Sequence, residues 1–124
     1  MDILASIYER AAADPQRVAF PEATEQGILQ AARECVDKGL IVPVLVGEPA
    51  AIRSAAAEHG IDLTGMELFD ATDEGAVDQL VAAYFQTNSM LSEKTLKRRA
   101  MRDGMYTALY LLALDKVDAM FAGL

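Results

Sequence analysis

Two glutamates follow a short apolar run near the start of the chain, where a carboxylate could take part in chemistry. Glu22 comes two residues after the run Val-Ala-Phe at 18–20, and Glu25 comes three residues later. A carboxylate at the end of a strand could orient a substrate or form an ion pair with an arginine from another segment. The alternative is structural, because polar and acidic side chains also begin helices. Both interpretations of Glu22 stay open at this point.

Five of the eleven basic residues are concentrated within nine positions: Lys94, Lys97, Arg98, Arg99 and Arg102. On a helix, positions 94, 98 and 102 form one stripe, because residues four apart lie on the same face. Such a stripe is commonly a solvated helix face. In an otherwise acidic chain it could also attract an anionic ligand or the acidic surface of a second copy.

Other residues that could do chemistry lack the companions that the chemistry needs. Gly-Glu-Pro at 47–49 has no lysine or later glycines, so it is interpreted as a turn rather than a phosphate loop. His59 and Cys35 occur once each, which predicts neither a disulfide nor a bound metal. We expect His59 at a helix end and Cys35 in the core. Gly123 closes a strand-like run, where a backbone can approach a ligand closely.

The composition is that of a folded domain without a membrane span. The chain has 124 residues, of which 52% are hydrophobic and 24% charged, with a formal net charge of −8. This predicts a single domain over residues 1–124 and excludes a disordered tail. The negative charge disfavours nucleic acid and anionic lipid as partners. With no signal-peptide pattern and no long apolar stretch, we expect a cytoplasmic protein.

Stretches of strand-like and helix-like periodicity alternate along the chain. Helices are expected at 2–13, from a cap at Thr24 to Gly39, at 49–58, after a cap at Thr72 or Asp73, from Ser92, and, as a further apolar helix after Asp103-Gly104, within 101–114. Strands are expected at 17–20, 40–46, 67–69 and 117–123. Pro43 predicts that its strand lies at an edge or starts at Pro43, because proline lacks the N–H that a central strand uses.

This alternation predicts an α/β fold with three layers, in which helices cover both faces of a mostly parallel sheet. The helix at 101–114 has apolar residues on more than one face, which predicts burial in the core. The chain stops directly after a strand-like run, although ligands in such folds bind beyond the carboxyl ends of strands. We therefore expect part of a larger domain, or a protein completed by a partner.

Four segments carry a resemblance to a known family. They are Val-Ala-Phe-Pro-Glu (18–22), Ile-Leu-Gln-Ala-Ala (28–32), Gly-Leu-Ile-Val-Pro-Val-Leu-Val-Gly (39–47) and Lys-Val-Asp-Ala-Met-Phe-Ala-Gly (116–123). Together they resemble the N-terminal part of the phosphate acetyl/butyryl transferases, the phosphotransacetylases. The resemblance covers nearly the whole chain in order, although a typical family member is much longer.

The resemblance implies an architecture similar to that of isocitrate and isopropylmalate dehydrogenases, here incomplete, with a cleft between two α/β subdomains. It implies a homodimer and an acyl transfer between coenzyme A, which is a substrate and not a cofactor, and phosphate. In that reaction a thiolate attacks an acyl phosphate. The chemistry needs cations for the phosphate, hydrogen-bond donors for the oxyanion and a carboxylate to help generate the thiolate.

The chain departs from the family's pattern where arginines are expected. Gln-Gly-Ile at 26–28 stands where the pattern has an arginine shortly after Pro-Glu, and Tyr-Phe-Gln-Thr at 84–87 stands where it has a second one. The family's catalytic arginine, serine and aspartate belong to a later part of the sequence. The resemblance therefore implies no catalytic residue in this chain, and it implies a substrate-binding or cleft-shaping role only for Pro21, Glu22 and Gly123.

Two functions follow as hypotheses. The first is the N-terminal region of a phosphate acyltransferase that binds acyl-CoA or acyl phosphate in its complete form and is inactive alone. The alternative is a non-enzymatic assembly module that keeps the subdomain fold and uses the basic segment at 94–102 or the apolar one at 101–114. A nucleotide-binding domain is disfavoured, because no glycine-rich fingerprint is present.

Overall fold

Four parallel strands form the sheet in the computed structural model, which describes residues 15–122. The strands are β1 (Gln16–Phe20), β2 (Ile41–Gly47), β3 (Glu67–Asp70) and β4 (Ala119–Met120), in the order β3-β2-β1-β4. Every neighbouring pair is parallel, with Phe20 opposite Leu45 and Ala19 opposite Met120. The expected α/β class and parallel sheet are confirmed, whereas the helix expected at 2–13 and Gly123 lie outside the described residues.

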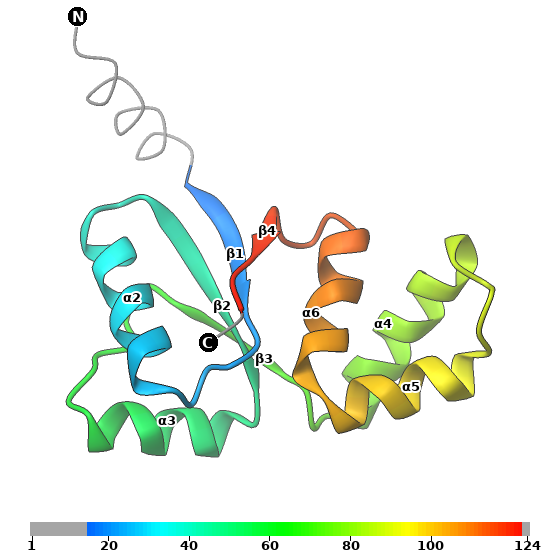
Figure 1. Ribbon diagram of the computed structural model, residues 1–124, viewed down its shortest axis with the longest axis horizontal. Helices are drawn as coiled ribbons and strands as arrows, with labels where there is room; N and C mark the ends of the chain where they lie inside the picture. The colour runs from blue at the N-terminus through cyan, green and yellow to red at the C-terminus, as the bar shows by residue number, and fades with distance from the viewer. Residues whose placement is uncertain (1–14, 123–124) are drawn as a thin grey trace, which may run out of the picture.

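Helices cover both faces of this sheet, as the sequence predicts (Figure 1). They are α2 (Gln26–Asp37), α3 (Pro49–Glu58), α4 (Glu74–Thr87), α5 (Glu93–Arg102) and α6 (Gly104–Ala113). The first two lie on one face, and α4 and α6 lie on the other, with α5 packed against α4 and α6. Within the described residues, none of these helices is long and apolar enough to cross a membrane. The likeness to the dehydrogenase fold stays a prediction.

Alternating side chains on the strands give the sheet an apolar core on each face. Phe20 and Leu45 are buried against α2 and α3, whereas Ala19, Val44 and Val46 are buried against the helices of the opposite face. This division follows from the period of two along a strand, which points successive side chains to opposite faces. The run at 40–46 is apolar throughout because both of its faces are covered.

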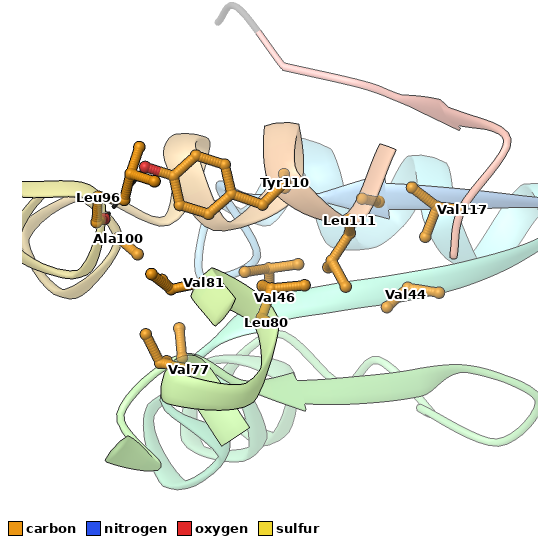
Figure 2. Packing of buried hydrophobic residues seen from close by; sticks show 13 residues of the cluster. Val44, Val46, Val77, Leu80, Val81, Leu96, Ala100, Tyr110, Leu111 and Val117 are labelled. Carbon is orange, nitrogen blue, oxygen red and sulfur yellow. Dashed lines mark hydrogen bonds between the residues drawn. The ribbon is translucent and has the colours of Figure 1, made fainter. Parts of the chain in front are cut away.

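The core on the second face joins α4, α5 and α6 to the sheet (Figure 2). Leu80 and Val81 of α4 and Leu111 of α6 are buried. Tyr110 extends from α6 to α5, where its hydroxyl donates a hydrogen bond of 3.0 Å to the backbone carbonyl of Leu96. Since α5 has no strand beside it, this bond and the apolar contacts around it hold α5 in place.

The prediction that Pro43 marks an edge or a strand start is wrong. Pro43 lies inside β2, which runs between β1 and β3. The physical reason is the register, because pairing with β3 begins only at Val44, opposite Glu67. At Pro43 the strand is paired with β1 alone, opposite Val18, so the proline does not interrupt the β2–β3 ladder.

Several predicted boundaries also need correction. The N-cap of α2 is Glu25 rather than Thr24, and its side chain makes no capping bond. The segment at 101–114 is not one helix, since the extended backbone of Asp103 ends α5 at Arg102 and caps α6. The final strand is shorter than expected, because only Ala119–Met120 pairs with β1.

The predicted burial of the apolar segment at 101–114 holds for only part of it. Tyr110 and Leu111 are buried, but Met101 is 39% exposed and Leu109 is 42% exposed. The break at Asp103 explains the difference for Met101, which belongs to the last turn of α5. Cys35 is half-buried rather than fully in the core, and His59 lies at the C-cap of α3, as expected.

Candidate functional site at the carboxyl ends of the strands

The end of β1 lies directly against the start of α6. A Cβ atom placed on Gly104 would lie 3.5 Å from the carbonyl oxygen of Pro21 and 3.8 Å from Cγ1 of Val46. These are ordinary contact distances, so the first residue of α6 packs on the carboxyl ends of β1 and β2. Figure 1 shows α6 starting at this edge of the sheet. Pro21, a predicted site residue, is therefore placed between the sheet and a helix N-terminus.

Glu22 lies in the turn that connects β1 to α2. The side chain is half-buried, and the backbone carbonyl of Glu22 accepts a 3.1 Å hydrogen bond from the amide of Glu25. The structure thus brings Pro21 and Glu22 together at the sheet edge where ligands bind in open α/β folds. Gly123, the third predicted site residue, lies outside the described residues. The substrate-binding role of all three stays a prediction.

An acidic residue stands at the N-cap position of every helix that begins at this edge, although only two of these side chains accept a capping hydrogen bond. The N-caps of α2, α3, α4 and α6 are Glu25, Glu48, Asp73 and Asp103. Asp73 accepts hydrogen bonds from the amides of the first turn of α4, and Asp103 accepts one of 3.0 Å from the amide of Met105. In the described part of the chain, the loops that directly follow the four strands contain no lysine or arginine. These loops therefore offer carboxylates but no cation for a phosphate.

Asp70, at the end of β3, holds the next loop in a fixed turn. Its Oδ1 accepts hydrogen bonds from the hydroxyl and the backbone amide of Thr72. These two bonds lower the pKa of Asp70, the hydroxyl having the larger effect. Asp62, in the loop before β3, has a lowered pKa for the same reason, with the amide of Thr64 as the largest cause and its hydroxyl as the next.

Replacing Thr72 by valine should raise the pKa of Asp70 toward its ordinary value, because the hydroxyl that favours the charged carboxylate is lost. The pKa of Asp62 should not change, which makes it an internal control. A titration of the side-chain carboxyl carbons by NMR measures both groups. An unchanged pKa of Asp70 would show that the hydroxyl does not stabilise its charge.

The same shifts predict a pH dependence of folding stability. Both carboxyl groups have a lower pKa in the folded chain, so the folded state is stabilised by them above the unfolded pKa near 4. That contribution is lost as the pH falls from about 4 through the lowered values. It should be smaller in Thr72→Val, as measured by urea unfolding at pH 7 and pH 3.

The basic cluster of α5 divides into bound and solvent-exposed side chains. Lys97 pairs with Asp78 of α4 at 3.0 Å, which raises the pKa of Lys97, and the guanidinium of Arg99 lies 5.5 Å from the ring centre of Tyr106. The predicted stripe of Lys94, Arg98 and Arg102 is exposed to solvent. Lys97 and Arg99 therefore connect α5 to α4 and α6. The stripe of Lys94, Arg98 and Arg102 stays exposed at the surface.

An apolar groove formed by α4, α5 and α6 was not predicted from the sequence. It consists of a cavity of about 640 Å³ beside the α4–α5 loop and an adjoining one of about 350 Å³ between α5 and α6. Tyr84, Leu91 and Leu96 line both cavities. One signal was present in the sequence, because residues 84–92 contain no charged side chain and include Met90 and Leu91.

A parallel sheet with helices on both faces defines an open α/β protein. In this class, ligands generally bind beyond the carboxyl ends of the strands, where Pro21 and Glu22 lie in this chain. A family model described as "Phosphate acetyl/butaryl transferase" matches residues 2–124. The chain therefore belongs to the phosphate acetyl/butyryl transferase family.

Individual relatives agree with this family. The chain is 34% identical over 125 residues to a phosphate acetyltransferase of Treponema pallidum, covering 99% of this chain and 37% of that protein. It is 32% identical over 111 residues to the phosphate acetyltransferase of Escherichia coli K12, covering 87% of this chain and 15% of that protein. The chain thus spans well under half of the length of these relatives.

Two solved structures are similar in fold. They are a phosphotransacetylase from Streptococcus pyogenes, with a TM-score of 0.82 and 17% identity, and the EutD phosphotransacetylase from Staphylococcus aureus, with a TM-score of 0.79 and 18% identity. Each match covers 97% of this chain, and 37% and 38% of the respective structures. The resemblance noted in the sequence is confirmed.

Proposed function

We propose that this chain forms one wall of the active-site cleft of a cytoplasmic phosphate acyltransferase, which moves an acyl group between coenzyme A and phosphate. Family membership over residues 2–124 is the observation that carries this proposal. The packing of Pro21 against the start of α6, with Glu22 in the adjacent turn, supports placing the wall at the carboxyl edge of the sheet. Coenzyme A is a substrate in this reaction, and the complete enzyme is a homo-oligomer.

In this reaction the thiolate of coenzyme A attacks the carbonyl carbon of an acyl phosphate. A carbon–sulfur bond forms, the carbon–oxygen bond to phosphate breaks, and inorganic phosphate leaves with the electron pair. The transition state needs donors for the oxyanion and cations for the phosphate. Pro21 shapes the cleft, and the Glu22 carboxylate orients a substrate or an arginine from another segment.

The cations for the phosphate come from outside the described loops. Acidic residues stand at the N-cap positions of the helices at this edge, and their carboxylates would repel a phosphate. Each charged hydrogen bond to phosphate contributes about 1.5–3 kcal/mol, so losing two or three of them abolishes useful binding. The 124-residue chain alone should therefore show no acyl exchange.

A chimera tests the proposal directly. The segment of the Treponema pallidum enzyme that matches this chain is replaced by residues 1–124, and formation of acetyl-CoA from acetyl phosphate and coenzyme A is measured. The chimera should turn over well above two controls, the 124-residue chain alone and the relative without its matched segment. A folded chimera that is no more active than these controls would refute the proposed function.

A further inference from the structure

The apolar groove of α4, α5 and α6 has one charged side chain in its walls, and that side chain is a cation. Among the described residues, those that line its two cavities include no aspartate or glutamate, although the chain has 19 acidic residues among 124. Arg99, on α5, lies in the wall of the smaller cavity. A hollow without acidic side chains in an acidic chain favours an anion over a cation as its ligand.

The guanidinium of Arg99 has no carboxylate to pair with. Arg99 is half-buried, and no described residue, within 15–122, forms an ion pair with it. Its guanidinium lies over the ring of Tyr106 instead, 5.5 Å from the ring centre. Lys97 on the same helix, by contrast, is paired with Asp78. A ring face compensates a cation only in part, so Arg99 can still bind an anion.

Three tyrosines, Tyr84, Tyr106 and Tyr110, line the same cavity as Arg99. The hydroxyl of Tyr110 donates its hydrogen bond to the carbonyl of Leu96 (Figure 2), whereas the other two hydroxyls have no hydrogen-bond partner among the residues that the structure describes. Burial raises the pKa of Tyr110, and the charge of Arg99 opposes that rise, so the positive field reaches the wall formed by α6. The cavity thus combines an unpaired cation with two hydroxyls that can donate to an anion.

The rest of the groove suits an elongated apolar body. Its cavities, of about 640 Å³ and about 350 Å³, adjoin and share Tyr84, Leu91 and Leu96 as lining residues. Volumes of this size are typical of sites for small ligands. Leu91 is 36% exposed and Leu109 is 42% exposed. A ligand in the groove would therefore remove from water apolar surface that the fold leaves exposed.

We propose that the groove binds a free fatty carboxylate, whose head group pairs with Arg99 and whose alkyl chain lies along the two cavities. A carboxylate can accept two parallel hydrogen bonds from a guanidinium, whereas a neutral alcohol cannot. The formal net charge of −8 disfavours an anionic membrane as the source of the same chemistry. This inference goes beyond the proposed acyl transfer and does not depend on it.

Calorimetric titration of the 124-residue chain with octanoate, below its micelle concentration, tests the proposal. Octanoate should bind at one site, and octanol, which has the same chain without the charge, should bind about tenfold more weakly. Arg99→Gln should weaken octanoate binding about tenfold, the effect of one charged hydrogen bond, and leave octanol binding unchanged. Arg98→Gln is the matched control, because it removes the same charge from an exposed position of the same helix that does not line the groove. It should bind octanoate like the parent chain.

NMR of the leucine methyl groups locates the ligand. Octanoate should shift the signals of Leu91 and Leu109 and leave that of Leu63, on the opposite face of the sheet, unchanged. Equal octanoate binding by the parent chain and Arg99→Gln would overturn the proposal, and so would equal binding of octanoate and octanol. Leu91 and Leu109 signals that shift on dilution without ligand would assign the groove to a second copy instead. Binding of phosphatidylglycerol vesicles in place of free octanoate would assign it to a membrane surface, and either result would refute the proposal.

Discussion

Replacing Tyr110 by alanine is expected to lower the free energy of unfolding by about 3–5 kcal/mol, the usual cost of removing a large buried aromatic side chain. The Tyr110 side chain is 3% exposed, and its ring centre lies 4.4 Å from that of Tyr84 in α4. Its hydroxyl is bonded to Leu96 in α5. One side chain therefore connects three helices, and its removal leaves a cavity where they meet.

Two further variants show how much of this loss comes from packing, how much from the hydrogen bond, and how much from shortening any side chain of α6. Tyr110→Phe should cost only about 1 kcal/mol, because it removes one hydrogen bond and keeps the ring. Leu109→Ala should cost less than Tyr110→Ala, since the neighbouring Leu109 is 42% exposed. Urea unfolding followed by circular dichroism measures all three. Equal losses for Tyr110→Ala and Leu109→Ala would contradict the burial described for α6.

The same hydroxyl also has a raised pKa, chiefly because burial disfavours the phenolate. Tyr110 thus stays neutral to a higher pH than an exposed tyrosine does. This agrees with its role as a hydrogen-bond donor in the core. The three helices it connects also frame the apolar groove, so Tyr110 holds the walls of that groove together.

The fold could be predicted from the sequence where local signals are strong. The β-branched run at 40–46 predicts a strand covered on both faces, and Pro49 fits the first turn of a helix. Gly39 and Gly60 end α2 and α3 with positive φ angles of 68° and 67°, which glycine adopts without strain. These signals depend on residues close together in the chain, so a linear pattern contains them.

Features that depend on distant residues could not be predicted. The place of Pro43 inside β2 depends on where β3 begins to pair, about twenty-four residues later. The side chain of Arg33 on α2 donates 2.8 Å hydrogen bonds to the carbonyls of Asp62 and Thr64, a contact with no local signal. The apolar groove was missed for the same reason, since it forms only when α4, α5 and α6 pack together.

The candidate site was predicted in part. The strand end at Pro21 and the turn at Glu22 follow from the apolar run and the proline that stops it. The start of α6 beside Pro21 was not predictable, because Gly104 is more than eighty residues away in the chain. The shortage of cations at this edge was visible in the sequence and holds in the described loops.

The shortage of cations at the sheet edge leads to a prediction at position 26. The pattern of the family has an arginine close to this position, where this chain has Gln-Gly-Ile at 26–28. Gln26 is exposed at the first turn of α2, next to Gly27, which has open space around it. An arginine there should reach a phosphate at the sheet edge. The new charged hydrogen bond is worth about 1.5–3 kcal/mol, which exceeds the cost of about 0.3–1 kcal/mol for a cation at a helix N-terminus.

In the chimera, Gln26→Arg should therefore lower the KM for acetyl phosphate about tenfold and leave kcat unchanged, because the new bond forms equally in the ground and transition states. Gln30→Arg is the matched control, since it adds the same charge to an exposed position one turn further from the sheet edge. Steady-state kinetics at low and high salt should show the effect fading with ionic strength for Gln26→Arg. An equal fall in KM for both variants would mean that net charge, and not the position at the edge, controls phosphate binding.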